Sequence, residues 1–175
     1  MKETVKQYIG RIRGYVAGKE PLRVLQATPG RLRKLVRRVP SRKLRRRPAP
    51  GKWSIAEILA HLADVELAVG YRVRMILGAP GTKIQAYDQD VWARAMRYRQ
   101  QDARQSLEAF CVLRERNLAL LRSLSPRQWK QYGMHQERGK ETVARIAEMF
   151  AGHDLNHLKQ IERLAGRKQR GKGKK

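Results

Sequence analysis

Apolar residues recur at spacings of three and four positions through most of the chain, and no segment sustains the period-two alternation of a half-buried strand. The pattern therefore predicts an all-α protein. We expect helices over residues 3–16, 29–39, 55–77, 88–97, 102–124 and about 141–165. Four of these segments contain between 14 and 25 residues, which predicts a four-helix bundle with additional short helices.

The start of the 55–77 helix carries the clearest local signal. Ser54 and Glu57 have the spacing of a capping box, in which each side chain accepts a hydrogen bond from the other residue's backbone N–H. Trp53 and Ile58 are placed to pack against each other across the first turn as a hydrophobic staple. Glycine and proline residues soon after position 77 end the helix.

The chain is strongly basic, and the excess charge is concentrated. Forty Lys and Arg residues against 15 Asp and Glu residues give a net charge of +25. Ten of the 17 residues in 31–47 and six of the ten in 166–175 are basic, and neither segment contains an acid. Like charges at this density resist packing, so we expect a solvated helix within 31–47, a Pro-rich loop over 48–51 and a disordered tail over 166–175.

The length of 175 residues fits one domain, which we place at residues 1–165. The longest stretch without a charged residue, 75–82, is far shorter than the roughly 20 apolar residues of a transmembrane helix, so we expect no membrane span. The N-terminus lacks the apolar core of a secretory signal, and the single cysteine cannot form an intramolecular disulfide. Cys111 lies on an apolar stripe, which predicts a buried, inert thiol. These features predict a cytoplasmic protein.

Three of the four histidines lie on apolar helical faces. His61 faces the core stripe of the 55–77 helix, and His153 and His157, four residues apart, share the inner face of the last helix. A pair at this spacing can bind one metal ion at about 2.0 to 2.1 Å. One interpretation is three core histidines, each with its own hydrogen-bond partner; the other is one divalent cation that satisfies three lone pairs together. The fourth, His135, lies in a polar segment, 132–139, which we expect to be a loop that could face the site.

These histidines lie in two sequence motifs that resemble a known family. The segments 50–66 and 152–161, together with 87–93 and 137–142, resemble the DinB-like, or YfiT-like, metalloenzymes, and the likeness covers residues 50–164. The resemblance implies a four-helix bundle that holds a divalent metal, usually nickel or zinc and sometimes iron or manganese, with three histidines. The implied ligands are His61, His153 and His157. Similar proteins often pair into homodimers, and the sequence leaves homodimerisation open for this chain.

The expected function follows from this ligand set. Three neutral histidines leave a divalent ion with at least one open coordination position, which is typical of a catalytic site. Some relatives are transferases or isomerases that use a low-molecular-weight thiol, but many have no assigned activity, so the resemblance does not assign the substrate. Either a water or a cofactor thiol could be the nucleophile at the metal, which leaves a hydrolase and a thiol-dependent S-transferase open, each acting on a small molecule. No motif in the chain identifies a thiol-binding pocket. Glu57 is the expected proton acceptor or hydrogen-bond partner of a metal ligand, although its spacing fits a purely capping role equally well.

Two other functions stay open from the sequence. The basic segments 31–47 and 166–175 favour non-specific binding of nucleic acid, and they are not a hallmark of the family. No zinc-finger, RRM or KH pattern supports sequence-specific recognition. Alternatively, the bundle is structural and its metal only connects helices. We expect Asp64 and Glu66 to contact solvent or pair with arginine.

Overall fold

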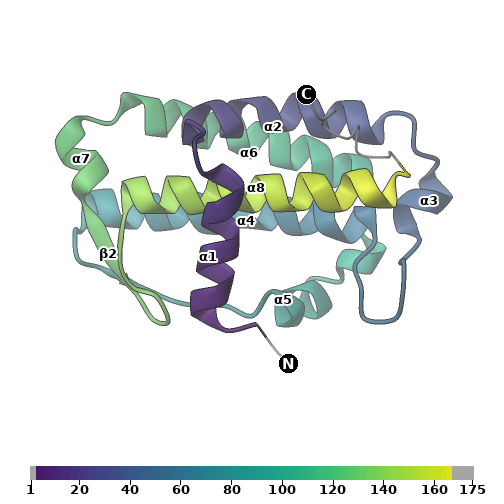
Figure 1. Ribbon diagram of the computed structural model, residues 1–175, viewed down its shortest axis with the longest axis horizontal. Coiled ribbons are helices and arrows are strands. Elements are labelled where there is room, and N and C mark those ends of the chain that lie inside the picture. The colour runs from purple at the N-terminus through teal and green to yellow at the C-terminus, as the bar shows by residue number, and fades with distance from the viewer. Residues whose placement is uncertain (1–2, 167–175) are drawn as a thin grey trace, which may run out of the picture.

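The computed structural model describes residues 3–166, which are mostly helical (Figure 1). The expected tail over 166–175 lies outside the described residues except for Gly166. In chain order, the elements are α1 (Val5–Val16), α2 (Pro21–Val36), α3 (Ser41–Arg45), α4 (Ile55–Gly78), β1 (Lys83–Ile84), α5 (Gln89–Ala95), the 3-10 helix η1 (Tyr98–Gln100), α6 (Ala103–Ser123), α7 (Pro126–Lys130), β2 (Tyr132–His135), β3 (Gly139–Thr142) and α8 (Val143–Leu164). Among these elements, no helix is long and apolar enough to cross a membrane.

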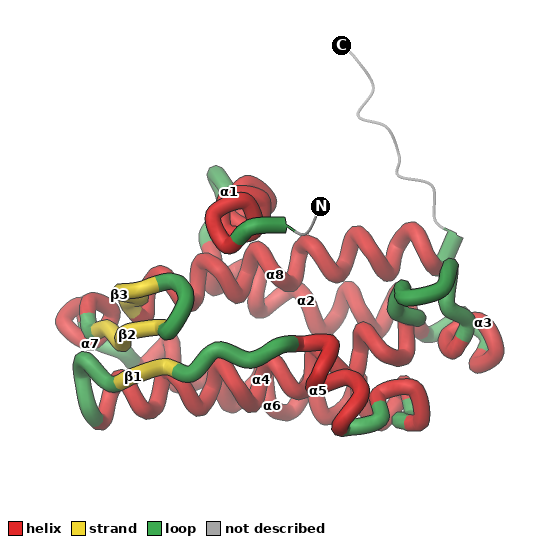
Figure 2. The backbone as a smooth tube through the Cα atoms, turned by 90° about the horizontal axis from the view of Figure 1, so that it is seen from below, coloured by secondary structure: helices red, strands yellow, loops and turns green. Residues whose placement is uncertain are grey.

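The four-helix bundle is confirmed, but one of its members differs from the expected one. Helices α2, α4, α6 and α8 form the bundle, in which α4 and α2 each pack against both α6 and α8. Helix α1 instead crosses the outer side of α8 (Figures 1 and 2). This crossing is close because Gly152 has no side chain, and a Cβ there would lie 2.2 Å from the carbonyl oxygen of Ile12.

Helix α2 begins eight residues earlier than expected and belongs to the core. Pro21 occupies its first position, where a missing N–H costs nothing, and the Glu20 carboxylate accepts hydrogen bonds from the next two N–H groups. The expectation of one solvated helix within 31–47 was wrong, because the segment contains the end of α2 and all of α3. Its basic side chains are exposed, whereas its apolar side chains are buried in the bundle. These buried residues are Leu32, Leu35, Val36, Val39 and Leu44.

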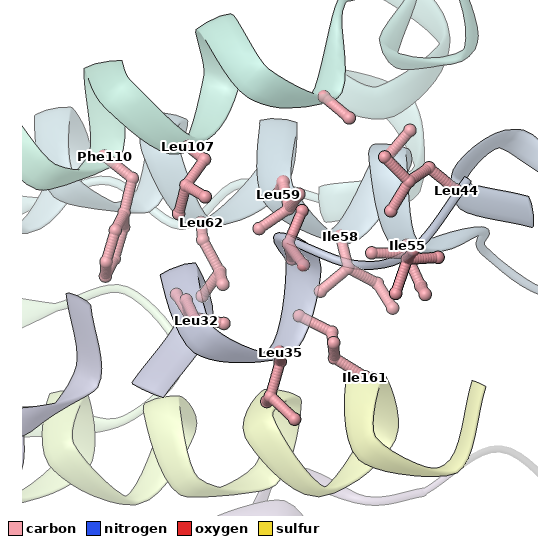
Figure 3. Close-up of a cluster of buried hydrophobic side chains, with 14 of the residues drawn as sticks. Leu32, Leu35, Leu44, Ile55, Ile58, Leu59, Leu62, Leu107, Phe110 and Ile161 are labelled. Atoms are coloured by element: carbon pink, nitrogen blue, oxygen red, sulfur yellow. The ribbon is translucent and has the colours of Figure 1, made fainter. Parts of the chain in front are cut away.

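The expected start of α4 is confirmed. Ser54 and Glu57 form a reciprocal capping box, and Trp53 packs against the core cluster that contains Ile58. That cluster fills one half of the bundle, where Leu59 and Leu62 of α4 meet residues of α2, α6 and α8 (Figure 3). Its burial stabilises the fold by about 25 cal/mol for each Å² of apolar surface removed from water.

The polar segment 132–139 was expected to be a loop, but it contains strand β2, the turn after it and the first residue of β3. Strands β2 and β3 pair antiparallel, and β1 pairs parallel with β2, so the strand order is β1-β2-β3 (Figure 2). Gly133 allows this pairing, because a Cβ there would lie 2.6 Å from the Ile84 side chain. Gly139 begins β3 with a positive φ of 71°. The sheet lies at one end of the bundle and places His135 on β2.

A buried ionic network connects all four bundle helices. Arg114 on α6, which is 1% exposed, donates hydrogen bonds to Glu66 on α4 at 2.7 Å, to Asp154 on α8 at 2.6 Å and to the Leu25 carbonyl on α2 at 2.9 Å. Asn117 donates a further hydrogen bond to Glu66. Glu66 therefore pairs with arginine, one of its two expected roles, but does so in the core and not at the surface. Asp154 directly follows His153, so the network also holds the helix that carries two of the site histidines.

Candidate metal centre

The structure brings His61, His153 and His157 together between α4 and α8. The Nε2 atoms of His61 and His153 are 3.0 Å apart, and those of His157 and His153 are 3.1 Å apart. One ligand atom from each ring lies within 4.8 Å of the others. His61 and His157 are buried and His153 is half-buried. The predicted inward orientation of all three side chains is therefore confirmed, and the contact between α4 and α8 brings the two motifs together.

Each imidazole in the cluster is held in its neutral form. Burial lowers the pKa of all three rings, to about 4 for His157. The neighbouring histidines lower the pKa of His61 and His153 further, because two positive rings would repel each other at this distance. At pH 7 each ring therefore has one nitrogen with a free lone pair, which is the form that binds a metal ion.

Hydrogen bonds within the cluster do not satisfy its three rings. Gln160 Oε1 lies 3.0 Å from His157 Nδ1, so it accepts the single proton of that neutral ring, and His157 Nε2 presents a lone pair. His153 Nε2 lies close to the Nε2 atoms of both other rings. In a neutral ring this atom carries either one proton or one lone pair, so it can form a hydrogen bond with only one of the two. A divalent cation would accept all three lone pairs. Nitrogens about 2.0 to 2.1 Å from a tetrahedral ion lie about 3.3 Å apart, near the observed spacing, so these residues fit such an ion.

Packing contacts around the cluster fix the orientation of the rings. The contact with Gln160 orients His157, as the outer hydrogen bonds of metal-binding histidines commonly do. The Trp53 ring lies 4.9 Å from the His61 ring, centroid to centroid. Gln160 follows His157 by three residues on α8, so helical spacing could have identified it as a partner in the sequence.

The cluster opens into a cavity of about 460 Å³ that lies between α1, α4, the sheet and α8. His61 and His153 line this cavity, and His135 on β2 lines it too. Its other polar lining residues are Glu3, Thr4, Tyr8, Arg72, Tyr87, Gln89, Glu137, Arg138 and Glu141. The sequence indicated that His135 could face the site, and the structure places it in the same cavity. A cavity of this size accommodates a small molecule.

Glu57 does not join the histidine cluster. Its carboxylate is 2% exposed and accepts hydrogen bonds from the Arg47 guanidinium and from Ser54. Burial raises the pKa of Glu57, but the hydrogen bonds from Arg47 and Ser54 outweigh it, so the net shift is downward. Glu57 lines a second pocket, which also contains Trp53 and Arg94, and not the cavity of the histidines. Its role as proton acceptor stays a prediction, and these contacts favour the capping role.

Cys111 is buried and forms no disulfide, and burial raises the pKa of its thiol, in agreement with the expected inert residue.

The features that sequence reasoning missed are the burial of Arg114 and Asp154. Charged residues on a helix normally indicate a solvated face, so no local signal distinguishes them from surface residues.

Comparisons with known proteins agree with this architecture. OB0782 of Oceanobacillus iheyensis, named as a candidate metal-dependent hydrolase, is 29% identical over 118 residues, which cover 67% of this chain and 68% of that protein. YfiT of Bacillus subtilis, named in the same way, is 26% identical over 148 residues, or 83% of each chain.

The solved structure of YfiT, described as a probable metal-dependent hydrolase with an unusual four-helix bundle topology, matches with a TM-score of 0.74 at 22% identity. The match covers 94% of this chain and 91% of that one and shows a common fold. The family model described as the DinB superfamily matches residues 25–161, which include most of α2, all three site histidines and the sheet. The chain therefore belongs to the DinB superfamily.

Proposed function

We propose that this protein is a metal-dependent hydrolase of small molecules, with a divalent ion held by His61, His153 and His157. One observation carries the proposal: three neutral ring nitrogens meet at the wall of an open cavity, where hydrogen bonds among them cannot satisfy all three rings. The similar proteins OB0782 and YfiT, both named as candidate metal-dependent hydrolases, support hydrolysis over other reactions. Nitrogen ligands suit zinc, nickel and iron, so the identity of the metal stays a prediction.

Each part of the site has a separate task in this proposal. The three imidazoles hold the ion, and Gln160 keeps the His157 lone pair directed toward it. When bound, a divalent ion with three histidine ligands supplies Lewis acidity and lowers the pKa of the water that it binds. A proton acceptor must share the cavity, and the carboxylates of Glu137 and Glu141 meet that condition, whereas Glu57 lines the other pocket.

Metal content tests the ligand set directly. Elemental analysis of the purified protein should find about one divalent ion per chain, and a His153→Ala/His157→Ala protein, the double-histidine variant, should have lost it. A Gln136→Ala protein is a matched control, since Gln136 lies on the exposed turn between β2 and β3, and it should keep its metal. Absence of metal from the wild-type protein, even after reconstitution, would refute the proposal.

Activity then separates hydrolysis from thiol transfer. The reconstituted protein should cleave members of a panel of chromogenic esters and amides, and a chelator should abolish cleavage until metal is restored. The same preparation is assayed for consumption of bacillithiol, mycothiol or glutathione with an electrophile. Metal-dependent thiol consumption without hydrolysis would replace the hydrolase by the thiol-dependent S-transferase that the sequence leaves open.

A second candidate function, non-specific binding of nucleic acid, rests on the exposed basic side chains of segment 31–47. Within the described chain, Arg31, Arg33 and Arg47 form ion pairs with glutamates. The remaining seven basic residues form no ion pair with a described residue; they are Lys34, Arg37, Arg38, Arg42, Lys43, Arg45 and Arg46. Such a surface binds the phosphates of any nucleic-acid sequence. The binding releases counterions from the nucleic acid in proportion to the number of phosphates that are neutralised.

Fluorescence anisotropy with a random DNA duplex tests this binding. Affinity should fall steeply with salt, and an Arg37→Gln/Arg38→Gln/Arg42→Gln variant should show a slope of log affinity against log salt that is flatter by about 2 to 3. A slope equal to that of the wild-type protein would count against this surface. Homodimerisation and a cytoplasmic location stay predictions.

A further inference from the structure

His135 lines the cavity and has an unused hydrogen-bond donor. Its ring is 4% exposed, and its Nδ1 atom accepts a hydrogen bond from the backbone N–H of Glu137 at 3.2 Å. Burial, with a further contribution from Arg138, lowers the pKa of His135 to about 4, so the ring is neutral at pH 7. With Nδ1 as acceptor, the single ring proton lies on Nε2. That atom is buried and has no hydrogen-bond partner in the described structure.

Buried donors are almost always satisfied in native proteins, and an exception indicates a missing partner. His135 Nε2 belongs to a ring that lines the same cavity as His61 and His153, although it comes from the sheet and not from the bundle. The geometry therefore calls for an acceptor atom at the part of the cavity wall that the sheet contributes.

The charges that face His135 favour an anionic acceptor. Arg138 and Glu141 neutralise each other through two hydrogen bonds of 2.7 and 2.9 Å. Arg72 on α4 lies over the Tyr87 ring and donates one hydrogen bond, to the backbone carbonyl of Gln85 at 2.7 Å. It forms no ion pair within residues 3–166, so most of its N–H donors and its full charge are available to a ligand.

The remaining acids at the cavity wall do not cancel this charge. Glu3, which lines the cavity, forms an ion pair with Arg11, which does not line it. Glu137 also lines the cavity, but it is exposed to solvent, which screens its charge more than that of the half-buried Arg72. The half-buried Arg72 therefore supplies the less screened charge at the cavity wall that also carries the His135 ring.

We propose that His135 Nε2–H and the Arg72 guanidinium form a subsite that binds a carboxylate group of the substrate. This inference deepens the proposed function and rests on it for the role of the cavity as the reaction site. It defines the substrate class as small molecules that carry a carboxylate separate from the bond that is cleaved. A hydrogen bond from a neutral ring and an arginine fork together select a carboxylate over a neutral group.

Calorimetric titration with benzoate tests the subsite, with benzyl alcohol as the neutral analogue. The wild-type, zinc-loaded protein should bind benzoate and show at least tenfold weaker binding of benzyl alcohol. His135→Phe and Arg72→Met should each weaken benzoate binding at least tenfold, the loss expected for a hydrogen bond to a charged group. His135→Gln, whose amide N–H can replace Nε2–H, should stay within about threefold of the wild-type protein. Arg94→Met, an exposed arginine in the other pocket, is the matched control and should change nothing.

A second measurement detects the His135 Nε2–H donor in the wild-type protein, so it does not depend on whether a variant folds. Long-range proton–nitrogen NMR of histidine-labelled protein should show His135 protonated at Nε2, and benzoate should shift that resonance. Benzoate affinity that is unchanged in His135→Phe, or a resonance that does not respond, would overturn the inference and would indicate binding at the metal alone. Failure of the proposed function shows separately, as loss of metal binding or hydrolysis while the His135 response to benzoate persists.

Discussion

Acidification should destabilise the metal-free protein, and His157 should account for a measurable share of the loss. The pKa of His157 is about 4 in the folded protein, because burial disfavours the charged ring, against an ordinary value of 6.5. Between these two values the unfolded chain binds more protons than the folded one. The free energy of unfolding therefore falls as the pH falls through this range, and the stabilising contribution is fully present only above about pH 6.5.

The size of this effect follows from the two pKa values. Each pH unit between them changes the free energy of unfolding by about 1.4 kcal/mol per group, so His157 should contribute about 2 kcal/mol between pH 7 and pH 5. Glu66 acts in the opposite direction, because burial raises its pKa to about 7 and the folded state then retains a proton that the unfolded chain has lost. The total pH dependence of the free energy of unfolding therefore combines contributions of opposite sign. The contribution of His157 is measured by comparing the wild-type protein with a variant that lacks it.

Urea unfolding of chelator-treated wild-type protein and of His157→Gln, at pH 7 and pH 5, measures this difference. Glutamine does not titrate, and it also removes the repulsion by which His157 lowers the pKa of His61 and His153. The wild-type protein should therefore lose at least about 2 kcal/mol more than the variant over this interval. Glu66 is present in both proteins, and its contribution cancels. An equal loss in both would refute the conclusion that the buried ring is neutral because it is desolvated.

Four further predictions concern the metal and the packing around it. Chelation should lower the melting temperature of the wild-type protein and leave that of the double-histidine variant unchanged, and an equal shift in both would contradict the ligand set. Gly152→Ala should lower the free energy of unfolding by about 1 to 3 kcal/mol in urea unfolding, because its Cβ would meet Ile12. Gly14→Ala, an exposed control in α1, should raise it by about 0.5 to 1 kcal/mol in the same assay. Arg114→Met should cost about 3 to 5 kcal/mol in the same assay above pH 7, where Glu66 is ionised, since the acids that it contacts lose their buried cation. A cost below about 1 kcal/mol would contradict a buried ion pair. Glu57→Gln retains a capping side chain, so elemental analysis should find its metal content unchanged, and loss of metal would instead support a role beside the ion.

Local patterns predicted the helices and the orientation of the site histidines. The capping box before α4 and the apolar periods of α4, α6 and α8 depend on neighbours within one or two turns, which a linear sequence displays. The pair His153 and His157 needed only helical spacing. Their union with His61 followed from the expectation that a bundle brings apolar faces together, and the structure confirms it.

The misassigned bundle member shows where local patterns fail. Helix α2 is rich in arginine, and its proline at the first position resembles a helix stop as much as a start. Only the burial of Leu25 and Leu32 against α6 and α8 reveals it as a bundle helix. The strands of the sheet contain two to four residues each, too few for an alternation to be recognised.

The sequence by itself determined which segments are helical and which faces of α4 and α8 carry imidazoles, because these properties depend on residues close together in the chain. Only the tertiary structure decided that Arg114 is buried, that Glu57 belongs to another pocket and that His135 enters the cavity of the metal ligands. Burial and electrostatic pairing arise between segments that are distant in the chain. A charged or polar residue looks the same in the sequence whether it meets water or a partner from another helix.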